Sequence, residues 1–309
     1  MRIAAIDLGT NTFNLLVADA DAQSYTEVLR DKRVVKLGLG GITNNTISEE
    51  AIQRGVSAIK DYIEIMAPLS VDKTLAVATS AIRSTNNGLE FTKLLKNKFN
   101  LEVRIIGGDE EAELIYYGIR RAINIQTENV LMLDIGGGSN EFIIGNGNRI
   151  SWKHSFTLGI ARLLETFEPS NPLTNNEIEN VILYFEKELK PLFEAINIYP
   201  VKKLVGSSGS FDTIANICSL MKCNKALNNE KTFFEFKKNE LNELCNKIII
   251  STTNERIAMP GMDLMRVEML PLAALFIKFI IAQTNVTEIT QSAYSIKEGI
   301  ILSYSETEN

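Results

Sequence analysis

The sequence is poor in the residues on which several common active sites depend. It contains one histidine, His154, and three cysteines, Cys218, Cys223 and Cys245, among 309 residues. A single histidine excludes zinc sites built from several histidines and most Ser–His–Asp triads. The cysteines form no Cys-x-x-Cys pair, and an odd number without a secretion signal argues against disulfides. Any acid–base chemistry therefore falls to carboxylates, with a structural or surface role expected for His154.

Long apolar runs and an excess of positive charge are also missing. The longest apolar run, Met269 to Ala282, contains Lys278 and is shorter than the roughly 18 residues that a membrane span needs. We interpret it as a buried core helix. The net charge of −6 argues against non-specific nucleic-acid binding. Because the sequence also shows no secretion signal and no membrane span, we expect a cytoplasmic protein without membrane or nucleic-acid partners. The basic stretch 30–36 is either a solvated strand face or a group that attracts a polyanion.

Two distant stretches share one pattern, in which an apolar run ends at an aspartate, a small polar turn follows, and a second apolar run begins. They read AIDLGTNTFNLLVAD from Ala5 and LMLDIGGGSNEFIIG from Leu131. Their separation is too long for a solenoid repeat. The duplication therefore predicts two similar domains, each opening with a strand–turn–strand, which suits a chain of this length.

Alternating strand-like and helix-like segments predict an α/β protein with a boundary near residues 118–128. Helix starts are indicated by the capping-box patterns Thr46–Glu49 and Thr174–Glu177. Ser84 is expected to cap a helix to about Lys98, and one helix is expected to run from Thr174 to about Ile196. Strands are predicted at 2–7, 14–19, 27–37, 74–79, 102–106, 130–135, 141–145, 149–156 and 203–205.

The two turns have the composition of anion-binding sites. Successive backbone N–H groups in a glycine-rich turn form a concavity for anions, and hydroxyl side chains add donors. Either turn alone could be an inert hairpin, but the duplication favours a phosphate clamp. The predicted phosphate-binding residues are Thr10, Asn11, Thr12, Gly136, Gly137, Gly138 and Ser139.

Three carboxylates flank these turns: Asp7, Asp134 and Glu141. Asp134 and Glu141 lie on opposite sides of one short turn, so they could approach each other. Two carboxylates that close repel one another, and a divalent cation relieves the repulsion. All-oxygen ligands predict Mg²⁺ or Mn²⁺.

One glutamate in the helix predicted after the glycine turn Gly107-Gly108 stands out by its position. At 100° per residue, Ala112, Ile115 and Ile119 belong to the apolar stripe of this helix. Glu111 lies at the edge of that stripe, whereas Glu110 and Glu113 point away from it. We therefore predict that Glu111 is turned inward, where a partly desolvated carboxylate can act as a general base toward water.

Two further positions suit anion binding but also have simpler explanations. Arg83 follows a predicted strand and could fork onto a phosphate or form a surface salt bridge. The segment Ser207–Ser210, with Ser208 and Gly209 at its centre, lies between a strand and a helix N-terminus. It could bind an anion or simply cap the helix.

These motifs together resemble the exopolyphosphatase / guanosine-pentaphosphate phosphohydrolase (Ppx/GppA) family. The matching stretches run in the family's order from residue 3 to about 302, and include IIGGDEEAELIYYGI from Ile105 and SFTLGIARL from Ser155. The phosphate turns recur across the wider actin-like (ASKHA) superfamily. The Glu-Glu-Ala helix combined with Asp-Ile-Gly-Gly-Gly-Ser-x-Glu is far more specific.

The resemblance implies two ribonuclease-H-like domains with an active-site cleft between them. The first would span residues 1–123 and be joined by a C-terminal helix at 293–309, and the second would span 124–292. By motif position, Glu111 resembles the family's catalytic base and Arg83 its phosphate-contacting arginine. Asp134 and Glu141 resemble its metal-associated acids.

The implied activity is Mg²⁺-dependent removal of terminal phosphate from inorganic polyphosphate. Hydrolysis of guanosine pentaphosphate, phosphotransfer to an acceptor and non-catalytic binding of polyphosphate or an alarmone remain alternatives. The family suggests a homodimer. The chain resembles the short, two-domain form without the additional C-terminal helical domain, and Leu39 stands where the family commonly has an acidic residue.

Overall fold

The computed structural model describes residues 1–21, 24–223, 226–227 and 231–307. The chain forms two compact units. The first comprises Met1–Gly118, the short turn Gly136–Ser139 and the C-terminal segment Ser295–Asn309. The second comprises Ile119–Ile135 and Asn140–Tyr294.

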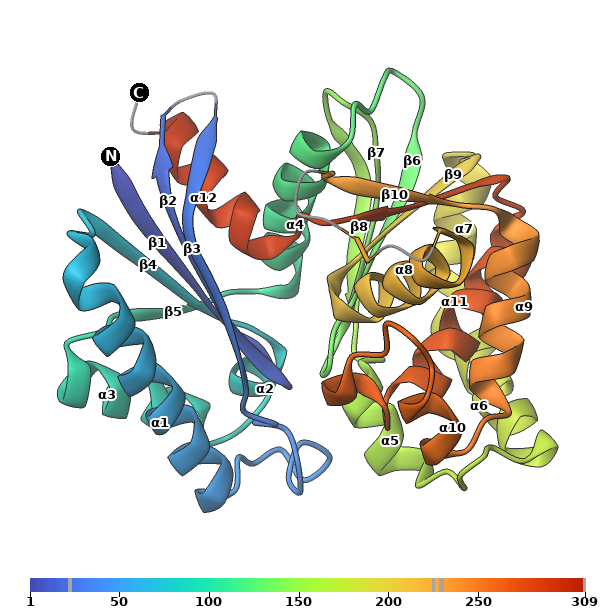
Figure 1. Ribbon diagram of the computed structural model, residues 1–309, viewed down its shortest axis with the longest axis horizontal. Coiled ribbons are helices and arrows are strands. Elements are labelled where there is room, and N and C mark those ends of the chain that lie inside the picture. Colours follow the sequence, from blue (N-terminus) through green and yellow to red (C-terminus); the bar gives the residue numbers. More distant parts are fainter. Residues whose placement is uncertain (22–23, 224–225, 228–230, 308–309) are drawn as a thin grey trace. The chain divides into compact units, whose positions relative to one another are not determined.

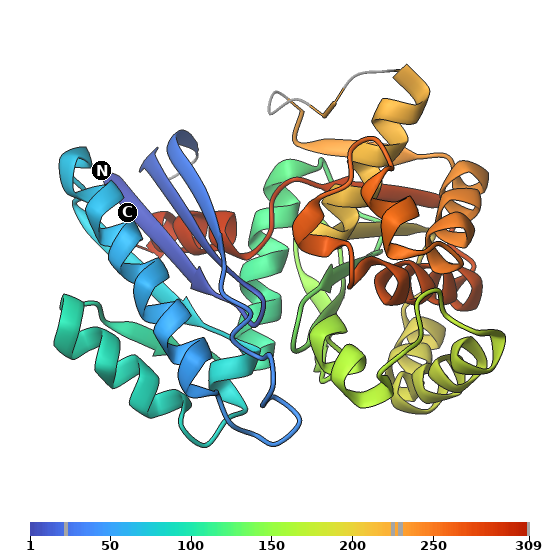
Figure 2. The same cartoon turned by 60° about the horizontal axis from the view of Figure 1, so that its bottom comes forward.

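The first unit contains a five-stranded sheet with helices on both faces. Its strand order is β3-β2-β1-β4-β5, with β1 antiparallel to β2 and parallel to β4. Helices α1 and α3 cover one face and α12 packs against β1 and β2 on the other (Figures 1 and 2). The strands are β1 (Arg2–Leu8), β2 (Thr12–Ala20), β3 (Tyr25–Val34), β4 (Lys73–Ala78) and β5 (Val103–Ile105). The helices are α1 (Glu49–Met66), η1 (Ala67–Leu69), α2 (Ser80–Arg83), α3 (Gly88–Phe99), α4 (Gly108–Ala122), which runs on into the second unit, and α12 (Ile296–Thr307).

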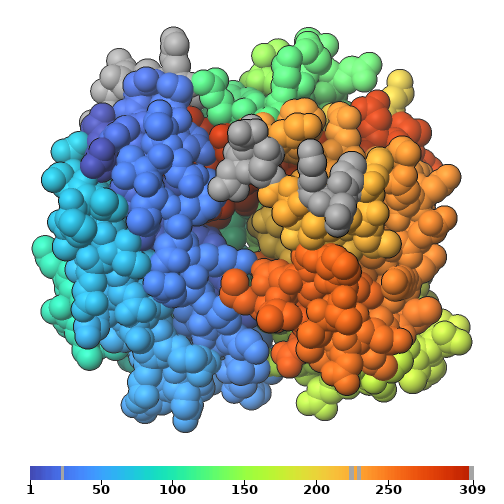
Figure 3. Space-filling model, in the orientation of Figure 1, coloured from blue at the N-terminus to red at the C-terminus, as the bar shows by residue number. Residues whose placement is uncertain are grey.

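This double cover explains the sequence of the central strand. Every residue of β1 after Arg2 is buried, and a strand buried on both faces reads as an apolar run rather than as an alternation. The edge strand β3 is different, because most of its side chains are exposed or half-buried. Its residues belong to the blue surface area of Figure 3.

The second unit contains a six-stranded sheet in the order β10-β11-β9-β6-β7-β8. The strands are β6 (Val130–Ile135), β7 (Asn140–Gly145), β8 (Ile150–Phe156), β9 (Lys203–Ser207), β10 (Phe233–Phe236) and β11 (Glu288–Ser292). The helices are α5 (Ile160–Phe167), α6 (Asn175–Glu188), α7 (Lys190–Ile198), α8 (Ser208–Cys223), α9 (Lys238–Ile249), α10 (Thr253–Ile257), η2 (Leu264–Arg266) and α11 (Leu270–Thr284).

The longest apolar run of the sequence forms α11, which confirms the predicted core helix. Leu272, Phe276 and Ile280 are fully buried, and Phe276 packs edge-on against Phe142 and Phe185. Within the described parts of the chain, no helix is long and apolar enough to cross a membrane.

The predicted duplication is visible in the hydrogen-bond ladders. In each sheet an antiparallel hairpin, β1–β2 or β6–β7, lies next to a parallel strand, β4 or β9, that follows a helical crossover. A third strand, β3 or β8, extends the hairpin on its other side. The two units therefore repeat one topology, as the repeated sequence pattern predicted.

Several predicted helix ends were wrong. The side chain of Ser48, not Thr46, caps α1 by accepting from the N–H of Ala51. Ser84 ends the short helix α2 instead of starting a long one. The predicted helix 174–196 is two helices that meet at Leu189, followed by Pro191 in the first turn of α7. The capping box between Thr174 and Glu177 is confirmed.

Candidate functional site

The two predicted phosphate turns close in the same way. The N–H of Gly9 donates to the carbonyl of Thr12 at 3.1 Å, and the N–H of Gly136 donates to the carbonyl of Ser139 at 3.1 Å. A Cβ atom at Gly9 would lie 2.7 Å from the Thr12 oxygen, and one at Gly136 would lie 2.4 Å from the Ser139 oxygen. Only glycine fits at these equivalent positions.

The turn of the first sheet carries donors that the protein leaves unused. Thr10, Asn11 and Thr12 are all buried. The backbone oxygen of Asn11 accepts from Val35 and Lys36, whereas its side-chain nitrogen is buried without a hydrogen-bond partner among the described residues. The hydroxyl of Ser80, at the start of α2, is in the same state. Because buried donors are normally satisfied, these orphaned groups point to a ligand with acceptor oxygens.

Glu111 is turned inward, as its position on the helix predicted. It is 7% exposed, whereas Glu113 is exposed and Glu110 half-buried. Its Oε2 accepts a hydrogen bond of 2.8 Å from Nη1 of Arg83, which also donates to the carbonyl of Ile106. The sequence did not predict this ion pair, because Arg83 and Glu111 lie on different helices. The guanidinium of Arg83 therefore fixes the orientation of this buried carboxylate.

Asp7, at the end of β1, has a neutral partner. Asn14 stands directly opposite it on β2, and its side-chain N–H₂ donates to Oδ2 of Asp7 at 2.9 Å. Asp7 is 7% exposed. Within the hairpin, the partner of the Asp7 carboxylate is thus an amide. The role of Asp7 in a metal site stays a prediction.

Asp134 and Glu141 are brought together as predicted. They face each other across the β6–β7 hairpin, and both are buried. The hydroxyl of Ser155 donates to Oε1 of Glu141 at 2.7 Å. The hydroxyls of Ser207 and Ser208 donate to Asp134 at 2.7 Å. Two acids therefore stand side by side on one face of the second sheet.

The segment Ser207–Ser210 lies partly inside a helix rather than in a loop. Helix α8 begins at Ser208, so Gly209 and Ser210 form its first turn. Ser208 has a left-handed backbone with a φ of 71° and orients its hydroxyl to Asp134 rather than to solvent. The hydroxyl of Ser210 is buried without a partner among the described residues.

Arg266, the cation beside this turn, was not identified from the sequence. Its guanidinium lies against Gly209, where a Cβ atom would come within 2.1 Å of it. Arg266 is 6% exposed and its Nε has no hydrogen-bond partner among the described residues. Burial lowers the pKa of Arg266, while Asp212, Asp263 and Asp134 act in the opposite direction. A positive group therefore stands at the N-terminus of α8, far from it in sequence.

Other residues singled out in the sequence lie elsewhere. In the basic stretch, Arg30 pairs with Glu298 and Arg33 with Asp31, so these two arginines are neutralised locally. His154 is exposed on β8 with its ring against Phe156.

The two cysteines whose side chains are described are free. Burial raises the pKa of the Cys218 thiol to about 11 and that of Cys245 to about 12. Neither thiol is therefore set up as a nucleophile. The side chain of Cys223 lies outside the described residues.

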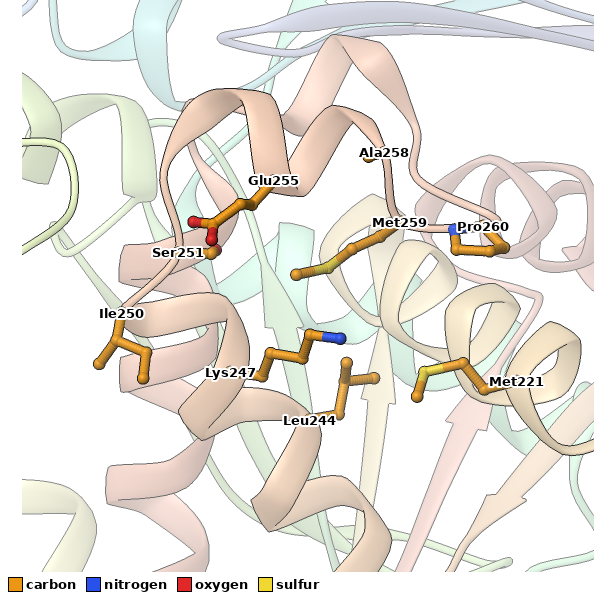
Figure 4. A pocket seen from close by; sticks show the side chains of 9 residues that line it. All are labelled: Met221, Leu244, Lys247, Ile250, Ser251, Glu255, Ala258, Met259 and Pro260. Carbon is orange, nitrogen blue, oxygen red and sulfur yellow. The ribbon is translucent and has the colours of Figure 1, made fainter.

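A hollow of about 490 Å³ on the second unit contains none of these groups. Met221, Leu244 and Met259 give it an apolar floor, and Lys247 and Glu255 lie at its side (Figure 4). The carboxylate of Glu255 is already bound to Thr252 in the capping box of α10. None of the residues that line the hollow belongs to the two turns, and its floor is apolar whereas the turns are polar.

The donor set of the second sheet suits a hard cation. Mg²⁺ is commonly held by one or two carboxylates, with water and substrate phosphate filling the other positions. Asp134 and Glu141 supply two oxygen ligands of this kind. No cluster of three or more His, Cys, Asp or Glu that could hold a metal ion exists among the described residues, so any such ion would depend on further ligands.

Sheet order, paired turns and flanking carboxylates define the class of protein. A sheet in which an antiparallel hairpin and its third strand continue into parallel strands, present twice and covered by helices, is the architecture of two ribonuclease-H-like domains. The family model for the Ppx/GppA phosphatase family matches residues 16–308. The chain belongs to this family and is therefore a hydrolase of the phosphatase type.

Solved structures agree with this assignment. An exopolyphosphatase from Cytophaga hutchinsonii is 36% identical, with a TM-score of 0.96 over 99% of this chain and 98% of that one. The Ppx/GppA family member from Aquifex aeolicus is 24% identical, with a TM-score of 0.83 over 100% of this chain and 99% of that one. The Aquifex structure supports the fold, and the Cytophaga structure also supports the family.

Proposed function

We propose that this protein is an exopolyphosphatase, which hydrolyses the terminal phosphoanhydride bond of inorganic polyphosphate with the help of a divalent cation such as Mg²⁺. The observation that carries the proposal is the buried, arginine-paired carboxylate of Glu111, in the unit that also holds the unused donors of Asn11 and Ser80. The similarity to an exopolyphosphatase over nearly the whole chain supports polyphosphate as the substrate class.

Glu111 would serve as the general base. A buried carboxylate can take a proton from water as the oxygen attacks the terminal phosphorus, with the shortened polyphosphate as the leaving group. Since Arg83 holds Glu111 from one side, the carboxylate is oriented before the substrate arrives. Proton transfer to a positioned base contributes about 10²–10⁴-fold to a rate.

The turns and arginines would position the phosphates. Phosphoryl transfer depends mainly on positioning and on stabilising charge on the phosphate oxygens. Thr10, Asn11, Thr12 and the N–H groups of residues 137–139 are donors of the required kind. Arg83 adds a positive charge near Glu111, and Arg266 adds one near the N-terminus of α8.

Asp134 and Glu141 would hold the cation. When bound, the ion supplies neutralisation of phosphate charge. The proposal assigns water activation to the first unit and cation binding to the second, so a variant in either unit should abolish the same reaction.

The test is phosphate release by the purified protein with Mg²⁺, using short polyphosphate, long polyphosphate and guanosine pentaphosphate side by side. We expect release from polyphosphate and a loss of at least about 100-fold in Glu111→Gln. Glu113→Gln is the matched control, because Glu113 lies on the same helix and is exposed.

Three results would change the proposal. Release only from guanosine pentaphosphate would move the same site to alarmone hydrolysis. Phosphate that appears on an added nucleoside diphosphate or sugar would show a phosphotransferase. Unchanged release by a folded Glu111→Gln protein would exclude Glu111 as the base.

A further inference from the structure

Four polar residues form a continuous row across four adjacent strands of the second sheet. Ser207 on β9 is the register partner of Asp134 on β6, Asp134 that of Glu141 on β7, and Glu141 that of Ser155 on β8. Register partners on neighbouring strands present their side chains on the same face of a sheet. The row is therefore hydroxyl, carboxylate, carboxylate, hydroxyl, and we call it the acid row.

Each outer hydroxyl is committed to the acid next to it. Ser155 donates to Oε1 of Glu141 at 2.7 Å, and Ser207 donates to Oδ2 of Asp134 at 2.7 Å. A hydroxyl has one proton to donate, whereas a carboxylate accepts at about four lone-pair positions. Such a bond fixes the orientation of a carboxylate, and carboxylates that ligate metal ions are commonly hydrogen-bonded in this way.

The hydroxyls orient the two acids but cannot cancel their charge. Glu141 is 1% exposed and Asp134 is 5% exposed, so solvent screens their mutual repulsion poorly. None of the four residues in the acid row is basic. Within the protein, Asp134 also acts on the charge of the buried Arg266, and a divalent cation is the further positive charge that the proposed function brings to the row.

We propose that Ser155 is a positioning residue for the divalent cation of this protein: its hydroxyl holds Glu141 in the orientation in which the acid row binds the ion. The inference rests on the cation dependence in the proposed function. Ser155 is the first residue of the SFTLG stretch. The sequence analysis assigned it no role in the site. Its place in the row depends on strand register, which brings it opposite Glu141.

Loss of such an outer-sphere hydrogen bond typically weakens metal affinity about 10–100-fold. Ser155→Ala removes the donor, whereas Ser155→Thr keeps a hydroxyl and suits a β-strand. Ser151→Ala is the matched control, because Ser151 lies on the same strand and its hydroxyl contacts Asn129, not an acid.

The experiment is calorimetric titration of the substrate-free protein and these three variants with Mg²⁺, repeated with Mn²⁺ followed by electron paramagnetic resonance. We expect affinity to fall about 10–100-fold in Ser155→Ala and to remain close to wild type in Ser155→Thr and Ser151→Ala. Equal affinity in Ser155→Ala and wild type would overturn the proposal, as would equal losses in Ser155→Ala and Ser151→Ala. Absence of any cation binding by the wild type would overturn it too.

The readout separates this inference from the proposed function. A wild-type protein that binds Mg²⁺ through Ser155 but releases phosphate from no substrate would contradict the hydrolase and leave the positioning role standing. A wild-type protein that releases phosphate normally, together with a Ser155→Ala variant that keeps full cation affinity, would support the hydrolase and contradict the positioning role of Ser155.

Discussion

The equivalent rows of the two sheets differ in charge, although their backbones match. In the first sheet the row reads Val77, Asp7, Asn14, Lys32 across β4, β1, β2 and β3. In the second it reads Ser207, Asp134, Glu141, Ser155. The first row has one acid, an amide bonded to it and a lysine at the far strand. The second has two adjacent acids and no basic residue, so two copies of one backbone carry different charges.

The same contrast extends to the rest of each group. In the first unit the buried acid Glu111 is paired with Arg83. In the second unit Asp134 and Glu141 accept hydrogen bonds from serine hydroxyls, and Asp134 also acts on the charge of Arg266. In the proposed function, duplication with divergence would thus assign water activation to one unit and neutralisation of the phosphate to the other.

Making the second row resemble the first should have the largest effect. Glu141→Gln creates an acid–amide pair like Asp7 and Asn14, and an amide cannot supply the negative charge that a hard cation requires. We expect phosphate release to fall by at least about 100-fold, and the rise in melting temperature on adding Mg²⁺ to disappear. Thermal unfolding with and without Mg²⁺, beside the phosphate assay, measures both.

Glu235→Gln provides the control for that change, because Glu235 is an exposed residue on β10 of the same sheet. A Glu141→Gln protein that still gains stability from Mg²⁺ would place the cation elsewhere.

The converse change, which makes the first row resemble the second, should have the next largest effect, here on the free energy of unfolding. Asn14→Asp puts a second carboxylate opposite Asp7, removes the hydrogen bond between them and introduces repulsion. We expect a loss of about 3 kcal/mol in the free energy of unfolding at pH 7. As the pH falls, one of the two acids takes up a proton and the loss should shrink. Urea unfolding at pH 7 and at lower pH measures it.

Asn14→Ala separates the two causes, since it removes the hydrogen bond without adding charge. Its loss should be smaller at pH 7 and should shrink less as the pH falls, because one hydrogen bond to the carboxylate is lost and no second charge is added. If the losses of the two variants changed in parallel with pH, charge repulsion would not explain Asn14→Asp.

Sequence reasoning located the features that depend on local spacing. The repeated Asp-x-Gly pattern predicted both turns because a hairpin and its closing bond lie within a few residues. Helical periodicity predicted the burial of Glu111 because the direction of a side chain on a helix follows from its position. The two-domain architecture followed from the repeat together with the family resemblance.

Features that depend on register or on distant contacts were not predictable in this way. Ser155 meets Glu141, and Arg83 meets Glu111, only after strands and helices have packed. Asn87 shows how tertiary contacts change helix starts: it precedes α3, but its amide is bonded to the backbone of Ile47. The Ser84 prediction failed because a local capping rule does not include such contacts.

Glu298 of α12 is a buried acid in the first unit, and basic side chains of the protein lie next to it. It can therefore be compared with the buried acids of the second sheet. Its carboxylate is fully buried, lies 2.8 Å from Arg30 and 3.3 Å from Lys297, and accepts from the N–H of Ser295. Burial alone would raise the pKa of Glu298, but Lys297 and Arg30 outweigh it and leave the pKa below the ordinary 4.5. An acid with a lowered pKa stabilises the fold above its unfolded-state pKa and loses that contribution as the pH falls through the folded-state pKa.

Glu298→Gln should therefore cost about 2 kcal/mol at pH 7, less than a fully buried pair, because Arg30 is partly exposed and keeps Glu27. The difference from wild type should narrow as the pH falls below 4.5, since the wild-type carboxyl then also loses its charge. Glu27→Gln, which removes the exposed acid on the same arginine, should cost less than about 1 kcal/mol. Urea unfolding at pH 7 and pH 4 distinguishes the cases. A constant loss for Glu298→Gln at both values would assign the effect to packing and not to the ion pair.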